Sequence, residues 1–248
     1  MLPKIIEFQA AKSYVDLKLD LPKPIKLNIP KWYKDLEHRA DFPTIKGCMP
    51  FLDTMTTGYS LSLPQDFILK HNVLEEGEVK SYMIPSKEDR FETIDINLNT
   101  RPTDQIHHIK QVEGSPFVKK NLEFPVQKIL NPWIIKTPPG YSCLFVSPLN
   151  NADDRFSIIP GIVNTDTFKV EINFPFIVNG DKYPVLDTIL KRGTPYVQVI
   201  PFKRDSWKMK IKEVSETKKN KLESFYFKHT IDLIHRYKTK WWNKSSFS

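Results

Sequence analysis

Pro138-Pro139-Gly140-Tyr141 is the first of three motifs that punctuate residues 137–204, and it is followed by Gly161-Ile162-Val163-Asn164-Thr165-Asp166 and Gly193-Thr194-Pro195-Tyr196-Val197-Gln198. Glycine and proline at these points favour turns, and the runs between them are apolar. Residues 141–146 and 197–200 contain few polar side chains, so both runs predict strands in the interior of a sheet. The stretch therefore predicts a β-rich core.

Outside this stretch, several segments alternate apolar and polar residues with the period of a half-buried strand. Residues 58–64 place Tyr59, Leu61 and Leu63 on one side, and residues 94–99 and 168–174 repeat the pattern. The chain has 20 prolines but only 8 glycines, and the prolines recur at the ends of short apolar runs, where they stop strands. We expect a mainly β protein, built as a sandwich or barrel of short strands.

The N-terminal part, residues 1–56, predicts extended segments and short helices. Residues 15–20 alternate as a half-exposed strand would, while residues 30–36 indicate a short helix with proline in its first turn. Phe51, Leu52 and Met55 are spaced like one face of a second short helix. We therefore divide the chain into residues 1–56, a β core over 57–204 with an insertion at about 66–130, and a C-terminal part over 205–248.

The C-terminal part differs from the rest in its charge. Residues 1–202 hold equal numbers of acidic and basic side chains, so the net charge of +8 comes entirely from the last 46 residues. From Ser215 the pattern predicts a long amphipathic helix. Its charged side is most simply a solvated helix face. The alternative is nucleic-acid binding, with Trp241 or Trp242 stacking on bases and phosphates bound by Lys218, Lys221, Lys228, Arg236 and Lys240.

The bulk composition favours a reducing compartment. Two cysteines among 248 residues are too few for a disulfide framework or a cysteine-rich zinc site. The N-terminus lacks the pattern of a signal peptide, and no apolar run is long enough for a membrane span. We expect a cytoplasmic protein without metal, cofactor or membrane contact. Cys143 lies in an apolar strand, and His107-His108 is most simply a pair of surface histidines.

The order of the strand and turn motifs resembles the β-clip fold of the deoxyuridine triphosphatases and dCTP deaminases. The similar segments are Thr57-Gly58-Tyr59-Ser60-Leu61, Ser147-Pro148-Leu149-Asn150 and the second and third motifs quoted above. The resemblance implies a β-clip core. However, Ser60 stands where that family has an aspartate, Leu149-Asn150 stands for its phosphate-binding Arg-Ser pair, and Asn164 replaces the aspartate that orients water. We therefore do not expect the family's hydrolytic activity.

A second resemblance covers most of the chain. Cys48 to Tyr59, Asn131 to Ser142 and Arg192-Gly193-Thr194-Pro195 are similar to an uncharacterised family of bacterial and tailed-phage proteins. This resemblance implies no activity. It suggests a phage-encoded protein in the host cytoplasm and leaves association with the virion open.

Three functional hypotheses follow. The leading one is a non-enzymatic β-clip-like binding or structural protein that forms a homo-oligomer or binds a protein partner, with no catalytic residue. The second is a nucleotide-handling enzyme or one of unfamiliar chemistry, using Asp53, Asp166 or His107. The third is nucleic-acid binding through the C-terminal helix. A small-ligand pocket would be lined by an aromatic wall and polar groups from Tyr59, Trp133, Tyr141, Asn164 and Asp166.

Overall fold

The computed structural model describes residues 4–16, 20–39, 44–73, 79–86, 107, 111–117, 126–229 and 236–248. The chain divides into two compact units. The first unit comprises Met1–Lys23 and Gly58–Lys203, and the second comprises Pro24–Thr57 and Arg204–Ser248.

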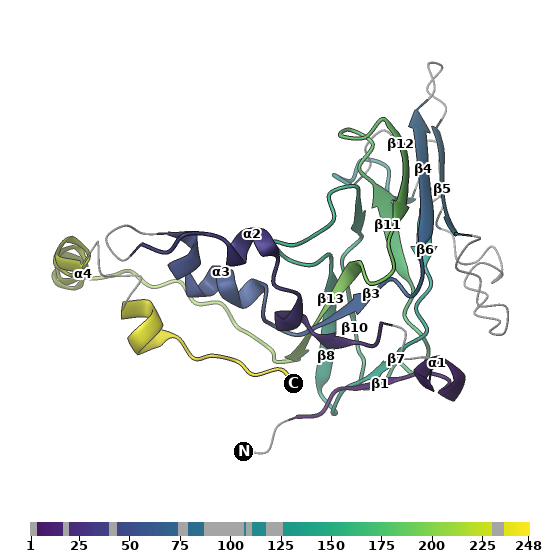
Figure 1. Ribbon diagram of the computed structural model, residues 1–248. Helices are drawn as coiled ribbons and strands as arrows, with labels where there is room; N and C mark the ends of the chain where they lie inside the picture. Colours follow the sequence, from purple (N-terminus) through teal and green to yellow (C-terminus); the bar gives the residue numbers. More distant parts are fainter. Residues whose placement is uncertain are drawn as a thin grey trace. The chain divides into compact units, whose positions relative to one another are not determined.

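The first unit is built from short antiparallel sheets (Figure 1). Its sheets have the strand orders β1-β7, β10-β8-β13-β3-β2, β6-β11-β9 and β12-β4-β5. The strands are β1 (Glu7–Gln9), β2 (Lys23–Pro24), β3 (Tyr59–Ser62), β4 (Phe67–Val73), β5 (Val79–Pro85), β6 (Gln127–Ile129), β7 (Ile134–Lys136), β8 (Tyr141–Val146), β9 (Phe156–Ile158), β10 (Gly161–Val163), β11 (Phe174–Val178), β12 (Val185–Leu190) and β13 (Pro195–Lys203). This architecture confirms the prediction of a mainly β protein.

Strand β13 lies at the centre of the largest sheet. It pairs with β3 on one side and with β8 on the other, so that Val199 lies opposite both Tyr59 and Phe145. Val197 and Val199 are fully buried, and both belong to the main hydrophobic core. The predictions of interior strands at residues 141–146 and 197–200 are therefore confirmed.

The sheet β12-β4-β5 was not predicted. Strands β4 and β5 fall within the expected insertion, and they run side by side in Figure 1. Ile68 of β4 lies opposite Ile189 of β12 and Ile84 of β5, which forms an apolar row across one face of this sheet. The opposite face of β4 places Phe67, Leu69 and His71 in the interior. The alternating segment at residues 94–99 lies outside the described residues.

The structure departs from two predicted strands. The alternation at 168–174 does not form a strand before Phe174, where β11 begins. The carbonyl of Asn164 accepts the backbone N–H groups of Thr167 and Phe168, so the chain turns there instead of extending. The strand predicted at residues 15–20 does not form at its start, because Val15 and Asp16 belong to helix α1 (Lys12–Asp16). Residues 17–19 lie outside the described residues. In both places the local pattern is overridden where backbone hydrogen bonds form a turn or a helix.

Packing explains why α1 is helical. Its Tyr14 is buried and lies edge-on against Trp133, with 5.4 Å between the ring centroids. Both side chains belong to the main core, together with Leu61, Phe145 and Val199. A strand at this position would not place Tyr14 against the indole in the same way, so the tertiary contact decides the conformation.

The second unit consists of short helices. They are η1 (Ile25–Asn28), α2 (Lys31–Lys34), η2 (Ile45–Gly47), α3 (Met49–Thr54), α4 (Glu216–His229) and the π-helical turn η6 (Tyr237–Trp241). Pro30 precedes the first turn of α2, and the rings of Tyr33 and Phe51 stack with centroids 5.9 Å apart. The predicted short helices near residues 30–36 and 51–55 are confirmed.

The structure describes only part of the region predicted to form the C-terminal helix. Helix α4 spans 14 residues, residues 230–235 lie outside the described residues, and the chain is helical again at η6. The described side chains of α4 are exposed, except for the half-buried Phe225. The predicted apolar face is therefore not covered over this span. In the described part of the chain, no helix combines the length and apolar character required to cross a membrane.

Candidate functional site

The polar residues of the second sequence motif meet the turn before β8. The hydroxyl of Ser142 donates a hydrogen bond to Oδ1 of Asn164 at 2.8 Å, and the backbone N–H of Gly140 donates to Oδ2 of Asp166, also at 2.8 Å. Between them, the hydroxyls of Thr137 and Thr165 lie 2.7 Å apart. These contacts tie the chain after β10 to the turn before β8.

The structure brings three of the five pocket candidates into this region. Tyr141 begins β8, and Asn164 and Asp166 follow β10, its antiparallel neighbour. The ammonium of Lys4 lies 4.5 Å from the centroid of the Tyr141 ring, which is a cation–π contact. An aromatic ring, an amide and a carboxylate thus come from two adjacent strand ends.

The other two candidates lie in the packed interior of the same unit. Tyr59 is half-buried at the start of β3, and its ring lies edge-on to Phe8 with 5.5 Å between centroids. Burial raises the pKa of Tyr59 above its ordinary value. Trp133 is only 5% exposed and packs on Tyr14 in the core. Both rings serve here as packing groups.

The residues that the sequence resemblance set against the triphosphatases' chemical positions make structural contacts here. Ser60 is fully buried, and its hydroxyl lies 3.4 Å from the carbonyl oxygen of Lys23, to which it donates. The backbone N–H of Leu149 donates to Oε1 of the buried Gln198 at 2.9 Å. Asn150 adopts a left-handed conformation with φ of 56°. The side chain of Gln198 therefore holds the turn at Leu149 and Asn150.

The residues proposed for an enzyme have separate environments. Oδ2 of Asp53, in the second unit, accepts a hydrogen bond from Nε1 of Trp242 at 2.9 Å. His107 forms an isolated antiparallel bridge with Val126 in the first unit. His108 lies outside the described residues. In the described part, no group of three or more histidine, cysteine or acidic side chains has the arrangement of a metal site.

Cys143 is buried in β8, as its apolar surroundings predicted. Burial raises the pKa of its thiol to about 11, although the nearby Thr165 hydroxyl acts in the opposite direction. A thiol that stays protonated at neutral pH is a poor nucleophile. Cys143 is therefore a core residue.

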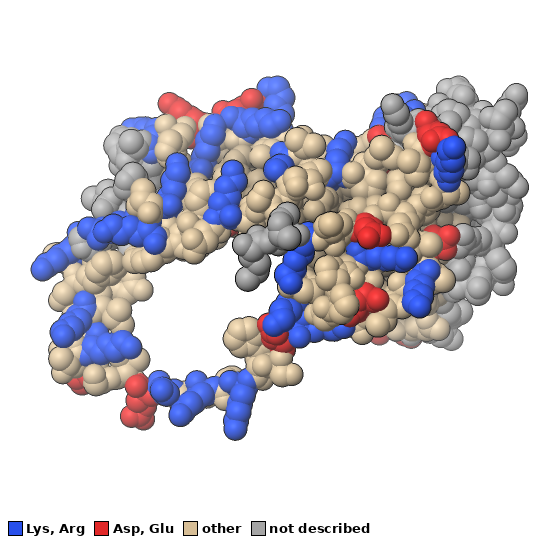
Figure 2. Space-filling view, turned by 90° about the horizontal axis from the view of Figure 1, so that it is seen from below, with Lys and Arg blue, Asp and Glu red and all other residues tan. Residues whose placement is uncertain are grey.

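The basic candidates lie on and after α4. Lys218, Lys221, Lys228 and Lys240 are exposed, whereas Arg236 is half-buried with its guanidinium 6.0 Å from the centroid of the Phe225 ring. Figure 2 shows several blue lysine and arginine side chains on the thin run of chain that leads from β13 to α4. The four lysines thus remain accessible to an anion.

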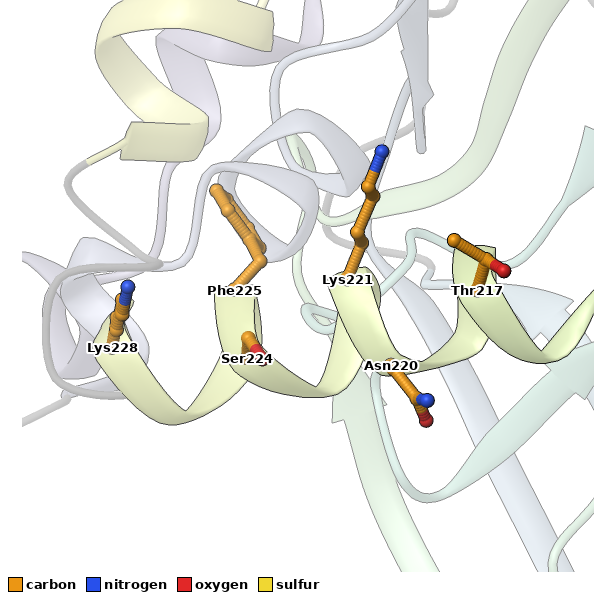
Figure 3. Close-up of a pocket in the computed structure, with 6 residues that line it drawn as sticks. All are labelled: Thr217, Asn220, Lys221, Ser224, Phe225 and Lys228. Atoms are coloured by element: carbon orange, nitrogen blue, oxygen red, sulfur yellow. The ribbon is translucent and has the colours of Figure 1, made fainter.

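One face of α4 lines an open hollow of about 550 Å³. In Figure 3, Lys221 and Phe225 point to the same side of the helix, while Asn220 points away from them. The lining is mixed, with two ammonium groups, two hydroxyls, one amide and one aromatic ring, from Thr217, Asn220, Lys221, Ser224, Phe225 and Lys228. None of the five pocket candidates lines this hollow.

Sequence reasoning missed a buried histidine. His71 of β4 is almost completely buried, and neither ring nitrogen has a hydrogen-bond partner among the described residues. Desolvation lowers the pKa of His71 below its ordinary value. Its segment, Lys70-His71-Asn72, is too polar to indicate an interior position, so no sequence signal identified it.

Comparisons with known proteins found neither a family model nor a curated protein that matches this chain.

Proposed function

We propose that this protein is a non-enzymatic β-clip-like module that acts by binding or by building an assembly. One observation carries the proposal: Ser60, Leu149, Asn164 and Gln198, which lie at or beside the positions where the resembling family binds phosphate and activates water, make contacts within the fold. These contacts fix strands and turns.

The chemistry of Asn164 supports this proposal further. A general base must accept a proton, and a neutral amide oxygen is far too weak a base to do so near neutral pH. Here Oδ1 of Asn164 already accepts the Ser142 hydroxyl. Its backbone carbonyl also accepts two N–H groups in the turn after β10. Asn164 is therefore suited to hold a turn.

The test is turnover of deoxynucleoside triphosphates by the purified protein. We expect no release of pyrophosphate, phosphate or ammonia from dUTP or dCTP. Turnover that is abolished by Asn164→Ala, but kept by a control substitution of the exposed Asn72 on β4, would refute the proposal. Turnover that is equal in both variants would also refute the proposal if the activity co-elutes with the protein in gel filtration.

A second candidate function is nucleic-acid binding by the C-terminal part. The exposed lysines of α4 and the basic lining of its hollow favour it. Phosphate binding releases counterions, so an affinity that rests on three or more lysines falls at least about tenfold between about 50 and 200 mM salt. Fluorescence anisotropy with single-stranded and duplex DNA tests this candidate. Binding that does not weaken in the Lys218, Lys221 and Lys228 to glutamine variant excludes this surface.

A further inference from the structure

The segment between β13 and α4, residues 204–214, has no regular secondary structure (Figure 1). We call it the arm. Its residues 207–212 alternate strictly, because Trp207, Met209 and Ile211 are each followed by a lysine. The exposed fractions of the three apolar side chains are 91%, 84% and 84%. The arm is therefore patterned as a half-buried strand but is not buried.

Within the arm, the backbone of residues 206–214 also lacks a partner among the described residues. No hydrogen bond joins residues 206–214 to any other described residue. Single exposed apolar side chains are common on protein surfaces, but three in succession on one side of an unpaired extended segment mark an interaction site. The edge strand of another molecule would supply hydrogen-bond partners for the backbone of the arm and an apolar neighbour for its exposed side chains.

We propose that the arm adds as a strand to the sheet of a second copy of this chain. The acceptor is β12, which lies at the edge of its sheet and pairs with β4 alone among the described strands. On its outer face Val185 is 68% exposed and Ile189 is 43% exposed. Ile189 begins the apolar row that continues through Ile68 and Ile84. The arm would extend this row by one strand.

Charge favours this arrangement over pairing between two arms. Two antiparallel arms centred on Met209 would place lysines 208 and 210 directly opposite each other, which is destabilising. Strand β12 carries no lysine or arginine and has one carboxylate, Asp187, that already pairs with Lys70 at 2.9 Å. Because each copy supplies one arm and one edge, the interaction can be reciprocal between two copies or continue around a ring.

This inference rests on the assembly role proposed above, but its test is independent of catalysis. Sedimentation velocity at tens of micromolar should give the wild-type chain at least twice the 29.0 kDa of one copy. The arm variant Trp207→Ser, Met209→Ser, Ile211→Ser should be monomeric. Phe227→Ser is the matched control, because it removes an apolar side chain of α4 that is 89% exposed and should leave the mass unchanged.

An acceptor variant gives a second, sharper test. Val185→Lys with Ile189→Lys should also produce monomers, because charges on an edge strand block strand addition. Mixing this variant with the arm variant should restore a complex, since the pair retains one intact arm and one intact edge. A monomeric wild type, an oligomer that survives the arm substitutions, or the absence of complementation would each overturn the inference. A monomer without turnover would still agree with the proposed non-enzymatic function.

Discussion

Gly58 lies directly against the backbone of Val199. A Cβ atom added to Gly58 would be 2.1 Å from the carbonyl oxygen of Val199, and the φ of Gly58 is +84°. Two independent constraints therefore require glycine at the start of β3: a left-handed backbone and the close approach of β13. Only backbone atoms stand in the way, so the contact cannot be relieved by a side-chain rotation.

We expect Gly58→Ala to lower the free energy of unfolding by about 3 kcal/mol or more, from the left-handed strain and the overlap together. Urea unfolding measures the effect. Gly140→Ala is the matched control, because its φ is +82° but no atom lies within 4 Å of the added Cβ, so about 1 kcal/mol should be lost. Equal losses in both variants would show that Val199 does not confine this position.

Asp166 should act as an acceptor for the turn at Gly140. Removing the acceptor in Asp166→Ala leaves the Gly140 N–H without this partner and should lower stability by about 1 kcal/mol. Asp166→Asn keeps an oxygen at the same place and should lose less. The exposed Asp181 provides a control for the loss of one negative charge. An asparagine variant as unstable as the alanine variant would contradict this role.

Stability should fall at alkaline pH because Cys143 and Tyr14 are buried as neutral groups. Burial raises the pKa of Cys143 from 9.0 to about 11 and that of Tyr14 from 10.0 to about 12. In each case the unfolded chain loses its proton first, so the stabilisation present below the unfolded pKa is lost as pH rises through the folded pKa. For Cys143 the loss between pH 9 and about 11 amounts to about 1–3 kcal/mol.

Urea unfolding at pH 8 to 11 measures this slope. Cys143→Ala should flatten it while lowering stability at neutral pH, because the variant leaves a small cavity. Tyr14→Phe should reduce the remaining loss above pH 10. An unchanged slope in both variants would show that other groups control alkaline unfolding.

His71 should make the fold sensitive to acid. Its pKa is lowered by burial, so below about pH 6.5 the unfolded chain binds a proton that the folded chain does not. The stabilisation is fully present above the pKa that His71 has in the unfolded chain. It is lost as pH falls through the lower pKa of His71 in the folded chain, by at most about 1.4 kcal/mol per pH unit for one proton. His71→Phe should remove this dependence. The exposed His38 serves as a control, and a slope that persists in His71→Phe would contradict the assignment.

The central strands could be predicted because both of their faces are buried. Residues 141–146 and 197–200 are mostly apolar, with Ser142 and Gln198 as polar exceptions, and such a composition suits few other environments. Strand β4 shows where prediction from composition fails. Its Lys70 and Asn72 face outward and its His71 faces inward, so the composition of the segment resembles that of a loop. The alternation at 168–174 is the opposite case: its pattern favours a strand, but Phe168 bonds to Asn164 in a turn and β11 begins only at Phe174.

The candidate site could be predicted only in part for a related reason. Residues 137–141 and 164–166 are each recognisable as turns, and both do take part in one cluster. Their pairing, however, depends on β8 and β10 being neighbours, which no short motif encodes. Trp133 looks equally suited to a core and to a pocket wall in sequence, and only its contact with Tyr14 distinguishes the two environments.

The central position of β13 has a consequence for synthesis. Strand β3 ends at Ser62, but β13, with which it pairs, begins only at Pro195. Strand β8 also pairs with β13 and is synthesised before it. A growing chain therefore exposes the buried sides of both strands until nearly all of the first unit has left the ribosome. Because such long-range closure is slow, nascent or truncated chains that end before Lys203 should depend on chaperones and should aggregate without them.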